Sequence, residues 1–112
     1  MKYKIYLIKC KINNKGYVGI TSSTLQKRWK IHLEGAENQR KMTNGKIIPF
    51  MAAINKYGSK NFNIKILEIV EGIKKAYKRE KHYIKKLRTF ASGPIPRLGY
   101  NCTLGGENTH RV

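Results

Sequence analysis

The chain has 112 residues and carries 24 Lys and Arg against 6 Asp and Glu, which gives a formal net charge of +18 at pH 7. This length suits one domain with a modest core, and the charge favours a polyanionic partner, with nucleic acid as the first choice and an anionic membrane surface as the second. No run approaches the roughly 18 apolar residues of a membrane span, no segment has the pattern of a signal peptide, and the Cys and His residues show no zinc spacing.

Residues 3–10 and 17–21 are predicted to form a β-hairpin. The first segment is apolar on both faces, which indicates a sheet that is covered on both sides. The letters "INNKG" between the two segments have the chemistry of a turn. With an even-numbered loop, Tyr6 and Tyr17 project from the same face of the hairpin. Tyrosine is a good strand former, so strand propensity is one explanation for both residues.

A Ser/Thr-rich cap at residues 21–24 precedes a predicted helix with Gly35 near its end. The apolar stripe of this helix consists of Leu25, Trp29, Leu33 and Ala36. Arg28 and His32 lie four residues apart on the edge of that stripe. They are either solvated residues beside a core face or a pair aimed at one spot, as the handling of a phosphate would require. Arginine offers a planar fork for phosphate oxygens, and histidine exchanges a proton near neutrality.

The remaining elements follow in chain order. The polar and basic residues 37–46 are predicted to form a loop. A second helix is predicted from about Ile48 to Tyr57, with Pro49 in its first turn and Gly58 as its stop. Residues 61–70 alternate like a strand, and a long helix is predicted from Ile73 to about residue 88. The Gly- and Pro-rich tail from residue 91 has room for one short helical or strand piece.

The last predicted helix has a single acid, and that acid lies on its apolar side. At about 100° per residue, the apolar face consists of Ile73, Ala76, Tyr77, Tyr83, Ile84 and Leu87, with Glu80 in its middle. A carboxylate in such a place costs several kcal/mol unless it is paired or bound to a metal. Glu80 is therefore either half of a buried ion pair, with Arg28 as its candidate partner, or a metal ligand or general acid/base.

The acids and the cysteines narrow the chemistry further. The chain has no aspartate, and its acids are Glu34, Glu37, Glu68, Glu71, Glu80 and Glu107. Nucleases with two metals held by clustered carboxylates need several convergent acids, so phosphate chemistry here would use one carboxylate or none. Cys10 and Cys102 do not form the framework of a secreted protein. We expect an intracellular protein in a reducing compartment, cytoplasmic or, in a eukaryotic or viral host, nuclear.

Six elements in series resemble the GIY-YIG endonuclease family, most of all the catalytic domains of phage-type homing endonucleases. They are Tyr6 in "KIY", Tyr17 in "YVG", Arg28 with His32, "KYGSKNF" at 56–62, Glu80 in "EKHYI" and "GYNCTLGG" with Asn101. A triplet alone carries no information, whereas this ordered series, from residue 3 to about residue 107, is specific. The triplets depart from the family's pattern, since "KIY" and "YVG" replace its two glycine-containing signatures and Lys4 stands where the first has glycine.

The resemblance implies an α+β fold, a small three-stranded antiparallel sheet flanked by helices, and a divalent-metal-dependent endonuclease that hydrolyses phosphodiester bonds in DNA. By this resemblance Glu80 would bind one metal, Mg²⁺ or Mn²⁺, and Arg28 would stabilise charge at the scissile phosphate. Tyr6 and Tyr17 would line the pocket, and one of them would activate or position the attacking water. His32 stands where other members carry tyrosine or histidine.

The same resemblance implies roles for two further residues. Asn101 would organise the site from the C-terminal segment, although an asparagine before a Gly-rich turn is also a common cap or turn residue. Gly19 would leave room beside the tyrosines for a backbone to approach. A free tyrosine has a pKa near 10 and is a weak base at pH 7, so either the surrounding cations lower that pKa or water is activated through a relay.

A second class of function competes with the enzyme. In a basic nucleic-acid-binding module without catalysis, the +18 charge grips phosphates and Glu80 merely pairs with Arg28; a ribosome-type structural protein is a third reading. The intact series of candidate residues favours the enzyme, because a binder needs no buried acid. DNA is the expected partner, with no membrane and no small-molecule cofactor. One site per domain predicts a monomer that nicks, unless two copies meet in a transient dimer.

Overall fold

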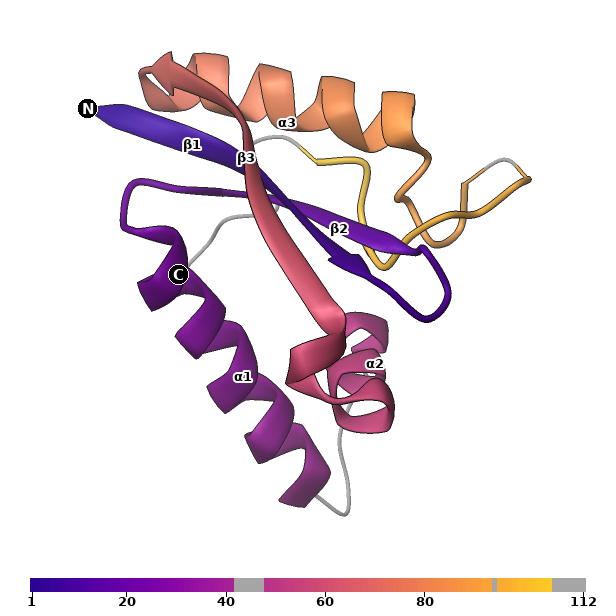
Figure 1. The fold of residues 1–112 in the computed structure, drawn as a ribbon. Coiled ribbons are helices and arrows are strands. Elements are labelled where there is room, and N and C mark those ends of the chain that lie inside the picture. Colours follow the sequence, from indigo (N-terminus) through magenta and orange to yellow (C-terminus); the bar gives the residue numbers. More distant parts are fainter. Residues whose placement is uncertain (42–47, 94, 106–112) are drawn as a thin grey trace.

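The computed structural model describes residues 1–41, 48–93 and 95–105 (Figure 1). Three strands form one antiparallel sheet in the order β2-β1-β3, with bounds β1 Lys2–Cys10, β2 Gly16–Thr21 and β3 Phe62–Glu71. The helices are α1 Leu25–Lys41, α2 Pro49–Tyr57 and α3 Ile73–Leu87, and a short 3-10 helix, η1, spans Ser59–Asn61. The predicted α+β class and the three-stranded antiparallel sheet are confirmed.

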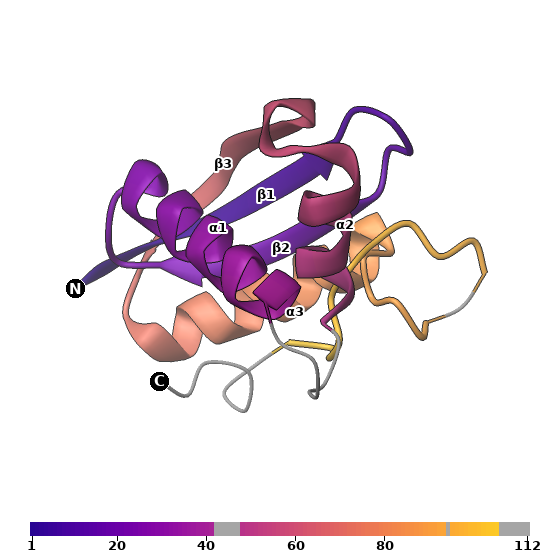
Figure 2. The ribbon, with the colours of Figure 1, turned by 90° about the horizontal axis from the view of Figure 1, so that it is seen from below.

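The sheet separates two layers of helices. Helices α1 and α2 pack together on one face and α3 covers the other, as the two perpendicular views show (Figures 1 and 2). The central strand β1 contributes side chains to the core on both faces of the sheet, because successive side chains of a strand point to opposite faces. Tyr6, Ile8 and Cys10 belong to the cluster under α1 and α2, whereas Ile5 and Leu7 belong to the cluster under α3. All five side chains are buried, so the prediction of a sheet covered on both sides is confirmed.

Helix α1 is longer than the sequence predicts. It continues through residues 37–41, so the loop predicted for 37–46 is wrong there, and residues 42–47 lie outside the described part of the chain. Gly35 does not stop the helix. It allows α2 to approach, because a Cβ at residue 35 would lie 2.5 Å from Cε of Met51. Two residues later Glu37 pairs with Arg40 and Lys41 at helical spacing, which supports the extra turn.

The other predicted elements are present. Helix α2 begins at Pro49 and ends at Gly58, which has a φ of 85°, and α3 ends before Arg88, whose left-handed backbone caps it. The tail then returns along β2: the N–H of Gly16 donates to the carbonyl oxygen of Leu98 at 2.9 Å, and the N–H of Tyr100 donates to that of Gly16 at 2.8 Å. In the described ranges no helix is long and apolar enough to cross a membrane.

Candidate active site

Strands β1 and β2 present two tyrosines on the same face. The register pairs Tyr6 with Gly19 and Ile8 with Tyr17. Residues opposite each other, and residues two apart on a strand, share a face of a sheet. The ring centroids of Tyr6 and Tyr17 are 6.5 Å apart. The predicted common orientation of the two tyrosines is therefore confirmed.

The ring of Tyr6 lies over Gly19. A Cβ at residue 19 would lie 2.4 Å from the Tyr6 hydroxyl oxygen and 2.5 Å from its Cζ. Since β2 is at the edge of the sheet, the phenol of a central-strand residue reaches across the edge strand. The expectation that Gly19 makes room for a backbone is wrong, because the Tyr6 side chain occupies that room.

Helix α1 brings two side chains to the Tyr6 hydroxyl. Nε of Arg28 donates to the hydroxyl oxygen at 3.1 Å, and Nε2 of His32 lies 2.9 Å from the same oxygen. His32 is only 5% exposed, so it is not a solvated residue beside the stripe, and Arg28 is half-buried. The four-residue spacing does aim both side chains at one spot, and that spot is the hydroxyl of Tyr6.

An aromatic cluster fixes Tyr17 and His32. The ring of Tyr17 stacks on that of Phe50 with centroids 4.5 Å apart and planes 4° from parallel. The His32 ring stands edge-on to both, at 5.2 Å from Tyr17 and 5.1 Å from Phe50. Sequence reasoning missed Phe50 as a neighbour of the site. Its apolar position beside Pro49 in the first turn of α2 indicates core packing, but the pattern does not show which residues it contacts.

Burial dominates the protonation of the two phenols. It raises the pKa of Tyr6 above the ordinary value, and a charge on Tyr17 would raise it further, whereas Arg28 lowers it by less. Burial likewise raises the pKa of Tyr17 against the opposing effect of Arg28. Both phenols are therefore protonated at neutral pH. Among the protein's own groups, the Arg28 guanidinium does not bring the pKa of either tyrosine below its ordinary value.

The two α1 side chains differ in charge at neutral pH: His32 is neutral and Arg28 is positively charged. Burial lowers the pKa of His32 to about 3, with the nearby Arg28 charge as a second cause, so the imidazole is neutral. Burial also works to lower the pKa of Arg28, but its contacts with Tyr6 and Tyr17 outweigh this and the net shift is upward. Arg28 is thus a permanent cation beside a neutral imidazole and two neutral phenols.

Glu80 reaches the site from the opposite layer of helices. It is 2% exposed and lies on α3 between the buried Ala76 and Ile84, as the helical pattern predicts. Burial is the main cause of the raised pKa of Tyr6 and Tyr17, and the negative charge of Glu80 is a smaller cause for each. The carboxylate is therefore within electrostatic reach of both phenols.

Asn101 holds the edge strand in place. Its Oδ1 accepts from the N–H of Val18 at 2.9 Å and its Nδ2 donates to the carbonyl oxygen of Val18 at 2.8 Å. The residue is buried, and its own N–H donates to the carbonyl oxygen of Thr89. Val18 lies between Tyr17 and Gly19, so Asn101 ties the tail to the part of β2 that carries the site.

The segment "KYGSKNF" at 56–62 has a packing role in the structure. It forms the end of α2, the η1 helix and the start of β3. Nδ2 of Asn61 donates to the carbonyl oxygen of Tyr57 at 2.6 Å. The ring of Phe62 lies 6.1 Å from that of Phe50 and 6.0 Å from that of Trp29. This segment supports the aromatic cluster behind the site.

The oxygen donors of the site fit a hard divalent cation. In the parts of the chain that the structure describes, no group of three or more His, Cys, Asp or Glu could hold a metal ion. Mg²⁺ prefers oxygen ligands, retains several waters and is commonly bound through one or two carboxylates together with substrate phosphates. A single carboxylate such as that of Glu80 suits Mg²⁺ or Mn²⁺ held in that way, whereas a structural zinc site needs four protein ligands.

Comparisons with known proteins identify a matching protein family and similar solved structures. A protein-family model described as the GIY-YIG catalytic domain matches residues 2–92. The chain is similar to a mutant of the catalytic domain of intron endonuclease I-TevI, with 32% identity over 92% of this chain and 95% of that one and a TM-score of 0.69. It is also similar to the catalytic domain of homing endonuclease I-TevI, with 30% identity over 90% and 98% of the two chains and a TM-score of 0.69. A search of curated protein sequences gave no significant match.

Proposed function

Because the chain belongs to the GIY-YIG catalytic-domain family, as its motifs predict, we propose that it is a divalent-metal-dependent DNA endonuclease that hydrolyses phosphodiester bonds. The observation that carries the proposal is the joint placement of Arg28 and His32 on the Tyr6 hydroxyl. Glu80 acts on the same phenol from the other face of the sheet. A fold-level match alone would support less, since folds host unrelated functions.

Arg28 is the residue that would stabilise the transition state. A guanidinium has five N–H donors, so the contacts of Arg28 with Tyr6 and Tyr17 leave other donors for the non-bridging oxygens of a phosphate. Its pKa is raised, so the charge persists throughout the reaction. One such preorganised donor is worth about 3–4 kcal/mol, or a factor of about 10²–10³ in rate.

Tyr6 would position the attacking water. Its hydroxyl oxygen is held by two partners, at 3.1 Å and 2.9 Å, which fixes its direction in space. Tyr17 is stacked on Phe50 and would form the wall of the pocket. The neutral His32 completes a short hydrogen-bonded chain from the hydroxyl into the protein interior, the relay that the raised tyrosine pKa values leave open.

Glu80 would hold the metal. Its burial means that the carboxylate is oriented by packing before any ion arrives. A divalent cation bound there would supply Lewis-acid polarisation and a bound water of lowered pKa. DNA is proposed as the substrate because the solved relatives are endonucleases and because the +18 charge suits a polyanion.

The test is to incubate supercoiled plasmid with the purified protein and MgCl₂, with and without EDTA. We expect nicked and then linear plasmid with Mg²⁺ alone. Protein that binds the plasmid and leaves it supercoiled at every Mg²⁺ and Mn²⁺ concentration would show a binding module instead. Cleavage that persists in EDTA would contradict the metal dependence.

We also propose that the domain acts as a monomer inside the cell. Both cysteine thiols are free, with Cys10 buried and Cys102 exposed, which suits a reducing compartment. Light scattering of the protein with and without DNA tests the monomer, and accumulation of nicked before linear plasmid is the kinetic outcome expected from it.

A further inference from the structure

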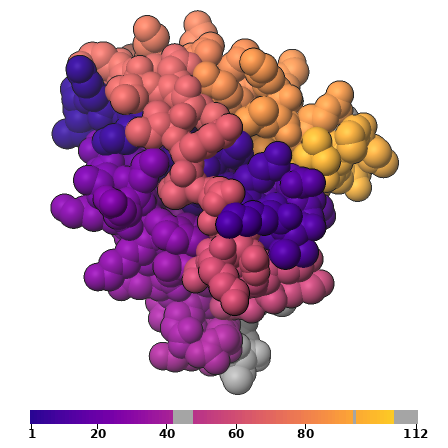
Figure 3. Space-filling model, viewed as in Figure 1, coloured from indigo at the N-terminus to yellow at the C-terminus, as the bar shows by residue number. Residues whose placement is uncertain are grey.

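A hollow lies on the sheet where α3 stops covering it. Helix α3 ends at Leu87, and two adjoining cavities of about 320 and 350 Å³ lie beyond it, sharing Leu7, Lys9 and Asn14 in their lining. We call the combined hollow the lysine groove. Its cationic lining residues are Lys9, Lys11, Lys65, Lys86 and Arg88. Figure 3 shows this side of the molecule. Atoms of β1 and of the β1–β2 hairpin are visible there between β3 and α3.

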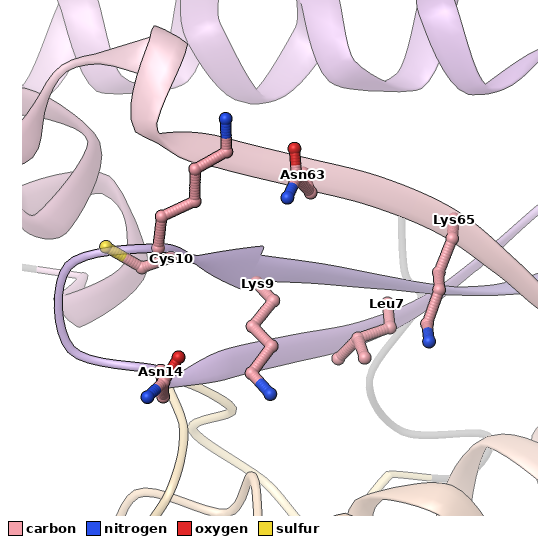
Figure 4. A pocket seen from close by; sticks show the side chains of 7 residues that line it. Leu7, Lys9, Cys10, Asn14, Asn63 and Lys65 are labelled. Carbon is pink, nitrogen blue, oxygen red and sulfur yellow. The ribbon is translucent and has the colours of Figure 1, made fainter.

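Strand register places the centre of the groove on one face. Leu7 pairs with Lys65 and Lys9 pairs with Asn63, so the four side chains project together. Leu7 belongs to the core cluster under α3, which identifies the face as the one that α3 covers further along. Figure 4 shows Lys9 and Lys65 on neighbouring strands, both extending to the same side, with Leu7 near them and Asn14 from the hairpin turn.

Among the described residues, the cations of this groove have no acid beside them, and no glutamate lines either cavity. Within the described ranges, the ion pairs join other groups: the N-terminus with Glu71, Arg40 and Lys41 with Glu37, and Arg79 with Glu68. Lys9, Lys65 and Asn63 are exposed at the groove, so two ammonium groups and an amide are available to a ligand.

The chemistry of the lining selects the ligand. Lysine side chains and asparagine amides are typical partners of phosphate oxygens, and Asn14 and Asn63 add amide donors to the cations. Cations spread along a hollow match the evenly spaced charges of a polynucleotide backbone. A flat anionic bilayer would meet the rim of a concave surface rather than its floor.

The groove is distinct from the candidate active site. Tyr6 faces the layer of α1 and α2, whereas Leu7 and Lys9 alternate with it and line the opposite face. We propose that the lysine groove binds the phosphodiester backbone of the DNA substrate at a position away from the scissile phosphate. This inference rests on the proposed function and adds a second DNA contact to it.

The binding experiment compares two pairs of substitutions that remove the same charge. Lys9→Gln with Lys65→Gln empties the groove of two cations, and Lys74→Gln with Lys78→Gln removes two from the exposed outer side of α3. Fluorescence anisotropy with a duplex of roughly 30 base pairs, in EDTA to prevent cleavage, gives Kd between about 50 and 200 mM salt. Because each lost phosphate contact lowers the slope of log K against log salt by about 0.9, the groove pair should lower it by about 1.8.

We expect the groove pair to weaken DNA binding by about tenfold or more at 100 mM salt, and the outer pair by less than about threefold. Equal losses in the two pairs, or a groove pair that binds like the wild type, overturns the proposal. The proposal is also overturned if polyglutamate displaces the bound duplex as effectively as competitor DNA of equal charge does, because the groove would then recognise charge alone.

A cleavage arm separates this inference from the proposed function. With Mg²⁺ and plasmid, the groove pair should raise KM and leave kcat within about twofold of the wild type, since no groove residue contacts Tyr6 or Arg28 in the described hydrogen bonds. A fall in kcat at saturating DNA would place the groove in the chemical step and contradict the proposal. If wild-type protein does not nick at all, the endonuclease assignment fails, and the EDTA binding data still decide whether the groove binds DNA.

Discussion

The phenol of Tyr6, on the central strand, lies directly across Gly19 of the edge strand, so close that a Cβ at residue 19 would be 2.4 Å from the phenolic oxygen. Moving the phenol aside would cost free energy, because its oxygen accepts a hydrogen bond from Nε of Arg28 and lies 2.9 Å from Nε2 of His32. The glycine of the "YVG" triplet is thus explained by Tyr6: without a side chain at residue 19, the edge strand leaves room for the Tyr6 hydroxyl.

Gly19→Ala should therefore displace the Tyr6 hydroxyl and remove most cleavage. Overpacking of this kind costs about 1–3 kcal/mol, so we expect a lower melting temperature together with a cleavage rate reduced by about 100-fold or more. Plasmid nicking and thermal melting measure the two effects. In a Tyr6→Leu background, where the hydroxyl and the ring are gone, the same alanine should cost little stability, and an undiminished cost there would show that the clash is with another group.

Most of the architecture follows from local patterns in the sequence. The β1 segment that is apolar on both faces, the stripe of α1 that includes Trp29 and Ala36, and the Gly58 stop of α2 are properties of short segments, and each is present. The position of Glu80 on the buried side of α3 also follows from helical spacing alone. These features depend on hydrophobic periodicity and on helix start and stop signals, both of which can be identified in a single sequence.

The parts that the sequence does not predict depend on contacts between distant segments. Gly35 has the local signature of a helix end, but α1 continues through it. In the structure the Met51 side chain of α2 packs against this glycine. Phe50 becomes a neighbour of Tyr17 only through the packing of α2 on the sheet. Likewise Asn101 has the local features of a turn residue, whereas its amide bonds the backbone of Val18, 83 residues away.

Arg28→Ala should abolish cleavage while leaving the fold and most DNA affinity in place. One cation among 24 Lys and Arg contributes a small share of binding, but this one is bonded to Tyr6. Loss of a few kcal/mol of transition-state stabilisation corresponds to about 100-fold or more in rate. Single-turnover cleavage, with Kd measured in EDTA, separates the two contributions.

The matched control for Arg28 is Lys30→Ala, which removes one positive charge from the exposed side of the same helix. It should cleave within about threefold of the wild type, since a solvated charge contributes mainly to association. Arg28→Ala activity equal to that of this control would place Arg28 outside the chemistry.

His32 should make the protein sensitive to mild acid. Its pKa is lowered to about 3 in the folded protein, against an ordinary value near 6.5, because burial and then Arg28 disfavour the imidazolium. Between those two pH values the unfolded chain binds a proton that the folded chain does not, so this contribution to stability is complete above about pH 6.5 and is lost as the pH falls towards 3. The slope should reach at most about 1.4 kcal/mol per pH unit.

Thermal melting from pH 7.5 to 5.0 measures this effect. The pKa values of Glu37, Glu68 and Glu71 are lowered, so these three groups stay ionised in that window. His32→Tyr keeps a hydroxyl near Tyr6 without a titrating imidazole, so its melting temperature should change less over the same range. His82→Gln, on the exposed side of α3, is the control for the loss of a histidine away from the site. If His32→Tyr matches the wild type, the acid sensitivity arises elsewhere.

Glu80→Gln distinguishes a metal ligand from a structural ion pair. Glutamine keeps the size of the side chain and much of its hydrogen bonding but removes the charge. If Glu80 holds the catalytic metal, the variant should fold normally, bind DNA as well as the wild type or slightly better, and fail to cleave at any Mg²⁺ concentration. Its melting temperature should be close to that of the wild type, because a substitution of equal size keeps the packing around residue 80.

If Glu80 instead serves to neutralise a buried Arg28, the glutamine variant leaves that charge uncompensated at a cost of about 3–5 kcal/mol, and the protein should melt far below the wild type. Glu68→Gln is the matched control, since Glu68 accepts from Nε of Arg79 and from the Tyr83 hydroxyl on the same helix, α3. It should lose some stability and keep its cleavage rate. A strongly destabilised Glu80→Gln protein that still nicks plasmid with Mg²⁺ would refute the ligand assignment. We expect the stable, inactive outcome, because the carboxylate is buried within electrostatic reach of both phenols and is the proposed holder of the metal.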